Sequence, residues 1–132
     1  MDLTGKAVII TGSSSGIGAA VAHRLSGLGA GLVVNSASSA EAGQRIAAEL
    51  ADAVYIQGDI GDPGTAAALV AAAEQRWGRL DGLVNNAGVT VDVPLHRVAT
   101  PEDITEACLA LIATRYATGQ TFLVDGGLGL AI

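Results

Sequence analysis

The residues with the most evident chemistry form a run of glycines and serines near the start of the chain. Residues 11–18 read Thr-Gly-Ser-Ser-Ser-Gly-Ile-Gly. Glycine lets the backbone turn tightly and approach a ligand closely, and the amino end of a helix offers unpaired N–H groups and a positive dipole to an anion. The serine hydroxyls, that of Ser13 included, add donors. We predict that this turn binds the pyrophosphate of a dinucleotide; the alternative is a turn without a ligand. The expected contacts are Gly12, Ser14, Ser15, Gly16, Ile17 and Gly18.

Two further groups of residues come after later apolar runs. One group follows residues 53–57, and the other follows a run that begins at residue 80. If both runs are strands of a parallel sheet, these groups lie at the carboxyl edge, where open α/β sheets bind ligands. The alternatives are that Asp59 only caps a loop and that Asn85 only forms a turn. The residues expected to contact the ligand are Asp59, Ile60, Asn86, Ala87 and Gly88.

The elements that must position these residues follow a regular alternation. We expect strands at residues 6–11, 31–35, 53–57, 80–85 and 121–125, and helices at about 16–28, 39–50, 63–77 and 101–112. Strands that alternate with helices of this length indicate βαβ units with right-handed crossovers. The sequence therefore predicts an α/β fold with a Rossmann-like, doubly wound parallel sheet of about five strands in the order 3-2-1-4-5.

Five segments, taken in this order along the chain, resemble the short-chain dehydrogenase/reductase family. They are residues 11–18, 59–60, 85–88, 101–104 and 119–127. The resemblance implies a nicotinamide dinucleotide as cofactor and the reduction of a carbonyl or the oxidation of an alcohol. It also implies that residues 11–18 are the cofactor turn, that Asp59 and Ile60 lie on the adenine side, and that residues 85–88 are the motif after the fourth strand.

The resemblance further implies a catalytic tyrosine followed four residues later by a lysine, whose charge lowers the pKa of the tyrosine. The tyrosines of this chain are Tyr55 and Tyr116, and neither has a lysine at that spacing. The single lysine is Lys6, which we expect at the opposite edge of the sheet. We therefore predict no catalytic residue of the usual kind. A short enzyme with His96 or Tyr116 as proton donor is the alternative.

The position at which the catalytic segment implied by the family resemblance is missing can be located in the sequence. Up to about residue 95 the chain resembles the first half of the family, and from about residue 94 it resembles the part that leads into the last helix. We expect a single truncated domain over residues 1–132 with a join near residues 94–100. Three interpretations stay open: a dinucleotide-binding protein without dehydrogenase catalysis, an oxidoreductase whose catalytic segment is absent from this sequence, and a non-enzymatic assembly module.

The end of the second expected strand bears on the choice of nucleotide. An NAD site of this type has an acid there, about 20 residues after the glycines, that binds the ribose 2′-OH. This chain has Asn35 and Ser36 instead, and no acid precedes Glu41. Because Ser36, Ser38 and Ser39 could bond a phosphate, we expect NADP(H) rather than NAD(H), with cofactor contacts at Asn35 and Ser36. The alternative is that the serines only cap the next helix.

Composition excludes several other classes of protein. Half of the residues are hydrophobic and 15% are charged, which argues against disorder. A net charge of −6 argues against a nucleic-acid partner or an anionic membrane surface. The single cysteine, Cys108, cannot form an intramolecular disulfide or a structural zinc site, so we expect a cytoplasmic protein without a metal.

Two expectations concern membranes and assembly. The chain has neither a basic-then-apolar leader nor an apolar run near the ~20 residues of a membrane span, so we expect no membrane partner. An α/β sheet that lacks strands exposes an edge and apolar helix faces unless another chain covers them. We therefore expect a homo-oligomer.

Overall fold

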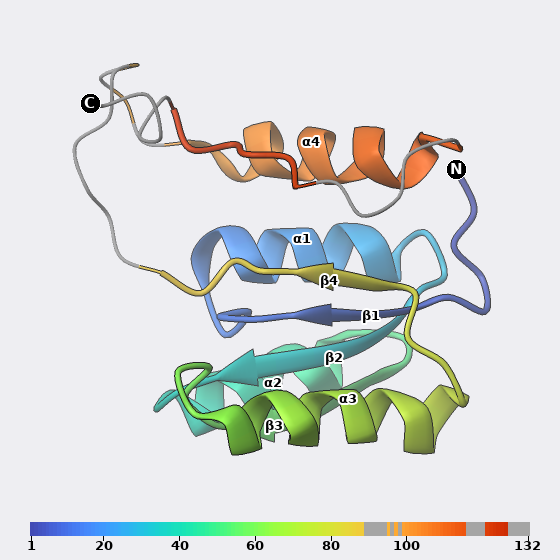
Figure 1. Ribbon diagram of the computed structural model, residues 1–132, viewed down its shortest axis with the longest axis vertical. Helices are drawn as coiled ribbons and strands as arrows, with labels where there is room; N and C mark the ends of the chain where they lie inside the picture. Colours follow the sequence, from blue (N-terminus) through green and yellow to red (C-terminus); the bar gives the residue numbers. More distant parts are fainter. Residues whose placement is uncertain (89–94, 96, 98, 116–120, 127–132) are drawn as a thin grey trace. The chain divides into compact units, whose positions relative to one another are not determined.

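The computed structural model describes residues 1–88, 95, 97, 99–115 and 121–126 (Figure 1). The chain divides into two compact units, Met1–Ala87 and Gly88–Ile132. The first unit contains the four strands and three of the helices of the described residues, and the second contains α4. The elements are β1 (Ala7–Ile10), α1 (Gly16–Ser26), β2 (Gly31–Ser36), α2 (Ala40–Glu49), β3 (Ala53–Gln57), α3 (Pro63–Trp77), β4 (Gly82–Val84) and α4 (Pro101–Ala113).

The first unit is built on a parallel sheet with the strand order β3-β2-β1-β4. This is the doubly wound, Rossmann-like arrangement that the alternation of strands and helices predicts, and it confirms the fold class. Ile10 of β1 lies level with Val34 of β2 and with Val84 of β4. The three strands therefore end close together, and the segments that follow them share one edge of the sheet.

Apolar residues on both faces of the sheet form the core. β1 is buried at all four positions and β2 at all six, as expected for central strands of a parallel sheet. On one face, Ile9 and Val33 pack with Leu69 and Ala73 of α3. Successive strand residues point to opposite faces, so the neighbours of Ile9 and Val33 fill the other side. This packing holds the central strands between two apolar layers.

Helix boundaries follow local signals in the sequence. Asp62 caps α3, because its side chain accepts a hydrogen bond from the Gly64 N–H at 3.0 Å, and a proline opens the helix. Gly78 ends α3 in a left-handed conformation with φ 69°. In the second unit, Thr100 and Asp103 form a reciprocal capping box at the start of α4. The helices expected at 63–77 and 101–112 are thus confirmed.

The second unit differs from expectation in one element. A fifth strand was expected over residues 121–125, but residues 121–124 form no strand, and the sheet has four strands in the described part of the chain. Phe122 and Leu123 are exposed. A strand exists only where a neighbouring strand completes its hydrogen bonds, so apolar composition alone did not suffice. Within the described residues, no helix is long and apolar enough to span a membrane.

Candidate functional site

The glycine turn between β1 and α1 requires glycine at two positions for reasons of space. Gly12 has a left-handed backbone with φ 62°, and a Cβ there would lie 2.9 Å from the Ala87 Cα. A Cβ on Gly18 would lie 2.5 Å from the Gly12 carbonyl oxygen and 2.6 Å from the Asn86 Nδ2. Real Cβ atoms do not make such contacts. Gly12 and Gly18 therefore let the turn pack closely against the segment that follows β4.

Gly16 differs from these two glycines because it faces open space. Its backbone is also left-handed, with φ 55°, yet no heavy atom lies within 4 Å of a Cβ placed there. Ser15, the residue before α1, makes no side-chain hydrogen bond to the helix, and the first turn of α1 carries no acid. The first N–H groups of a helix have no partner within it. The amino end of α1 thus has the donors and the room that a pyrophosphate needs.

The three serines of the turn have different environments. Ser14 is half-buried and Ser15 is exposed, which leaves both near the open side of the turn. Ser13 is buried, and its hydroxyl donates to the Ile10 carbonyl oxygen at 2.8 Å and accepts from the Asn35 N–H at 2.9 Å. The expectation that the Ser13 hydroxyl is a donor for the ligand is therefore wrong, because that hydroxyl holds the turn to β2.

Asn86 and Ala87 lie directly against the glycine turn. The Asn86 side-chain amide donates to the Thr11 carbonyl oxygen at 3.0 Å and to that of Gly12 at 3.1 Å. The backbone N–H groups of Asn86 and Ala87 donate to the Thr11 hydroxyl oxygen at 3.0 and 3.1 Å. Gly88, the third residue expected here, is exposed and begins the second unit. Thr11 is buried and accepts hydrogen bonds from both of these residues, a role that the sequence pattern did not reveal.

Asn35, at the end of β2, is almost completely buried, with 2% of its surface exposed. Its side-chain amide donates to the carbonyl oxygens of Ile56 and Gly58 at 3.1 and 3.0 Å, and its side-chain oxygen accepts from the Gly12 N–H at 3.4 Å. The side chain thus connects the glycine turn to the end of β3.

Asp59 and Ile60 follow β3 on the exposed side of the same edge. One Asp59 carboxylate oxygen accepts from the Gly61 N–H at 2.8 Å, which shapes the turn before α3. Ile60 exposes 38% of its surface. An exposed carboxylate and an exposed apolar side chain next to each other can receive the polar edge and the flat face of an aromatic base.

The serines at the end of β2 and before α2 differ in their exposure to solvent. The hydroxyl oxygen of Ser36 lies 2.7 Å from that of Tyr55, and Ser36 is buried beneath this contact. Ser38 and Ser39 are exposed, and Ser39 precedes α2 without a side-chain cap. Tyr55 entered the sequence analysis only as a tyrosine without a paired lysine. In the structure its ring packs at Gly43 of α2 and its hydroxyl contacts Ser36.

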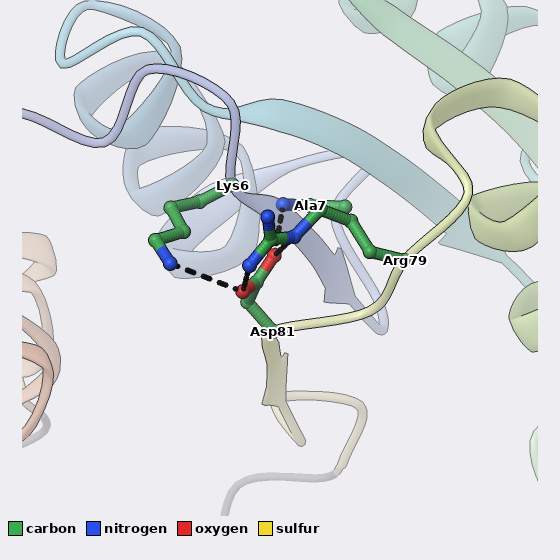
Figure 2. Close-up of polar contacts among 4 residues, drawn as sticks. All are labelled: Lys6, Ala7, Arg79 and Asp81. Atoms are coloured by element: carbon green, nitrogen blue, oxygen red, sulfur yellow. Dashed lines mark hydrogen bonds and ion pairs between the residues drawn. The ribbon is translucent and has the colours of Figure 1, made fainter.

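The single lysine lies at the other end of β1, as expected (Figure 2). The Lys6 ammonium is 3.4 Å from Asp81 Oδ1, the Ala7 N–H donates to Asp81 Oδ2 at 2.9 Å, and Arg79 forms two further bonds to the same carboxylate. The hydrogen bond from Arg79, supported by those from Ala7 and Lys6, lowers the pKa of Asp81 from 3.8 to about 2. Lys6 therefore belongs to a structural cluster that joins the starts of β1 and β4.

No tyrosine–lysine pair is formed among the residues that the structure describes. Tyr55 bonds to Ser36, and Lys6 bonds to Asp81. The alternative proton donors His96 and Tyr116 lie outside the described residues. Within the described ranges, no three His, Cys, Asp or Glu side chains are grouped as metal ligands. What this edge of the sheet does offer is the open amino end of α1 and the exposed side chains of Ser15 and Asp59.

Comparison with known proteins gives a consistent result. The family model of the short chain dehydrogenase matches residues 6–116. A Streptomyces violaceoruber protein, assigned as ketoacyl reductase 2 of the granaticin polyketide synthase, is 50% identical over 96 residues, which cover 71% of this chain and 39% of that protein. Versicolorin reductase 1 of Aspergillus parasiticus is 41% identical over 105 residues, which cover 76% of this chain and 40% of that protein.

A solved structure resembles this chain as well. The crystal structure of a short chain dehydrogenase from Burkholderia cenocepacia in complex with NADP has 35% sequence identity and a TM-score of 0.64. The match covers 80% of this chain and 44% of that one. The chain therefore spans less than half the length of these relatives.

Proposed function

We propose a function on the basis of the family match. This chain belongs to the short-chain dehydrogenase family. The first unit binds a nicotinamide dinucleotide at the carboxyl edge of its sheet. The observation that carries this proposal is the glycine turn, in which Gly12 and Gly18 are packed against Asn86 and Ala87 while Gly16 faces open space beside the amino end of α1. That combination leaves room for a ligand only on the side where the helix offers its donors.

The site residues are assigned to the parts of the cofactor by their place on this edge. Ser14, Ser15, Gly16 and Ile17 surround the amino end of α1 and would hold the pyrophosphate. Asp59 and Ile60 would receive the adenine, and Ala87 would lie toward the nicotinamide. Gly12, Gly18 and Asn86 shape the turn and have little contact of their own with the cofactor. The bound cofactor supplies hydride transfer.

NADP(H) is the preferred form of the cofactor in this proposal. No carboxylate stands at the end of β2 to repel a 2′-phosphate, and the exposed Ser38 and Ser39 hydroxyls lie before the amino end of α2. The Burkholderia relative was solved with NADP. Ser36 is buried against Tyr55, so its role is to support this segment rather than to bond the phosphate. Glu41, in the first turn of α2, opposes the preference.

This sequence by itself is proposed to bind the cofactor without dehydrogenase turnover. A neighbouring cation lowers the pKa of a tyrosine toward neutral pH and so makes proton transfer from it easier, and the one lysine is held by Asp81. Loss of a positioned acid or base removes about 10²–10⁴ in rate. The second candidate function is carbonyl reduction, which the names of two relatives favour, with the catalytic groups in the part of those proteins that this chain does not span.

A matched pair of glycine substitutions tests the cofactor site. Gly16 and Gly78 both have left-handed backbones and open space at the Cβ position, so alanine strains each to a similar extent, by about 1–2 kcal/mol. Gly78 ends α3 and is not part of the proposed site. We expect Gly16→Ala to weaken NADPH binding by about tenfold to a hundredfold, because its methyl group displaces the pyrophosphate.

The same titration of NADPH into Gly78→Ala should give the affinity of the original chain. Equal affinities for both variants would show that the turn does not contact the cofactor. Turnover is measured separately with a panel of carbonyl substrates and NADPH. Rates typical of complete reductases would contradict the proposal that this sequence lacks catalysis.

A further inference from the structure

We propose that Asn35 is a positioning residue of the dinucleotide site, which holds the pyrophosphate turn and the adenine-side turn at a fixed separation, and that it does not touch the cofactor. This inference rests on the proposed function. It replaces the sequence-based expectation of a direct contact at Asn35 with a different role for the same residue.

Both N–H donors of the Asn35 side chain are already used within the protein. An amide group carries two N–H donors, and those of Asn35 donate to the carbonyl oxygens of Ile56 and Gly58 at 3.1 and 3.0 Å. The side-chain oxygen accepts from the Gly12 N–H. With only 2% of the residue exposed, a cofactor in the open part of the site cannot reach these atoms.

The main chain of Asn35 is tied to the same turn. Its N–H donates to the Ser13 hydroxyl oxygen at 2.9 Å, and its carbonyl oxygen accepts from the Ser13 N–H at 2.8 Å. The Ser13 hydroxyl in turn donates to the Ile10 carbonyl oxygen. Asn35, which lies on β2, thus bonds directly to the end of β3 and, through Ser13, to the end of β1.

This bonding pattern joins two parts of the proposed site that are distant in sequence. Gly12 belongs to the turn that would hold the pyrophosphate, and Gly58 directly precedes Asp59, which would receive the adenine. Adenosine and pyrophosphate are parts of one molecule, so both contacts form only if the two turns keep the right separation. Small errors in such geometry cost much of the binding energy.

The chemistry of the position selects asparagine. The substitution Asn35→Asp would set a carboxylate oxygen against two carbonyl oxygens, with no proton to share. A leucine would fill the volume but would leave the partly buried carbonyl oxygens of Ile56 and Gly58 and the Gly12 N–H without this partner. Only an amide offers two donors and one acceptor in this shape.

The test measures how the full chain binds ADP, which spans both turns, and 2′,3′-dideoxy-ADP, which lacks the ribose hydroxyls. The variants are Asn35→Leu and Ser13→Ala, and the second keeps the test possible if the first does not fold. Trp77→Phe is the control, because it removes a hydrogen bond to Asp52 of 2.7 Å that lies outside the proposed site. Thermal melts identify a temperature at which every variant is folded.

We expect Asn35→Leu and Ser13→Ala to bind both nucleotides about tenfold more weakly than the original chain, by the same factor for each. Trp77→Phe should lower the melting temperature and leave both affinities unchanged. A factor that disappears with the dideoxy nucleotide would show a direct ribose contact and overturn the inference. Unchanged affinity in the two site variants would show that Asn35 contributes only to the stability of the fold, and this result would also overturn the inference. If the original chain binds neither ADP nor NADPH, the proposed function itself is wrong, and the inference falls with it.

Discussion

The Asp81 carboxylate joins the starts of β1 and β4 and allows a prediction about the stability of the first unit. It receives hydrogen bonds from Arg79, the Ala7 N–H and Lys6, and its pKa is lowered to about 2. In the unfolded chain the carboxyl titrates near 3.8. A depressed pKa stabilises the folded state at any pH above the unfolded value, and that contribution is lost as the pH falls from about 4 toward 2.

Replacement of this carboxylate therefore has a defined effect on stability. We expect Asp81→Asn to lower the free energy of unfolding at pH 7 by about 1–3 kcal/mol, since it removes the acceptor of charge-assisted bonds. The difference from the original chain, measured by urea unfolding, should shrink as the pH is lowered from 4 to 2. A difference that stays constant over this interval would contradict this role of Asp81. Nucleotide affinity should not change, because the cluster lies at the opposite end of β1.

The two exposed serines before α2 provide a test of cofactor preference. We expect the double variant Ser38→Ala, Ser39→Ala to lose affinity for NADPH by about fivefold to tenfold, equivalent to one or two hydrogen bonds to a charged group, and to keep its affinity for NADH. Parallel titrations of both nucleotides measure the ratio. An equal loss for both would show that these hydroxyls do not distinguish the 2′-phosphate.

At the residue scale, the tight turn that the glycines form was easier to predict from the sequence than the role of Asn35. Glycines at this spacing directly after a strand are typical of a tight turn, and the packing of Gly12 and Gly18 gives the physical reason for them. Asn35 was expected to contact the cofactor because of its place at the end of β2. Its burial depends on β3, which is distant in sequence, so no local pattern could reveal that its amide is already bonded.

At the scale of elements, helix ends were predictable because their signals are local. Asp62 followed by Pro63 predicts the start of α3, and the structure shows the side-chain cap. We expect Asp62→Ala to lower the free energy of unfolding by about 1 kcal/mol, while Asp62→Asn, which can still accept the bond, costs less. Urea unfolding of the two variants compares them. Equal losses would show that the cap hydrogen bond does not stabilise the helix.

Strands were less predictable than helices because they depend on partners. The runs at 31–35 and 53–57 became β2 and β3, since each pairs with a neighbouring strand. Residues 121–124 have a similar apolar composition and form no strand. Composition reports that a segment can be buried in a sheet, but only the rest of the fold decides whether a ladder partner is present.

At the scale of the whole molecule, the homo-oligomer remains a prediction, and the edge strand β4 offers a way to test it. β4 ends the sheet in the described part of the chain, and Leu83 on this strand is 58% exposed. An apolar edge strand invites pairing with another chain. We expect light scattering to give a multiple of 13.1 kDa, and Leu83→Lys to give the monomer mass.

Val70→Lys is the matched control for this prediction, because Val70 is also exposed in the first unit but lies on α3 rather than on the edge strand. It should leave the mass in solution unchanged. A monomer for the original chain would contradict the expectation. The predictions of one domain over residues 1–132 and of a join near residues 94–100 remain predictions, beside a structure that divides at Ala87 into two compact units.

The most direct test of the central claim is a titration of NADPH into the full chain, followed by calorimetry or by the fluorescence of the reduced nicotinamide. We predict saturable binding of one NADPH per chain with competition by ADP, because ADP carries the adenosine and the pyrophosphate that the proposed site would contact. No saturable signal at millimolar NADPH would contradict the claim that the glycine turn of this chain is a dinucleotide site.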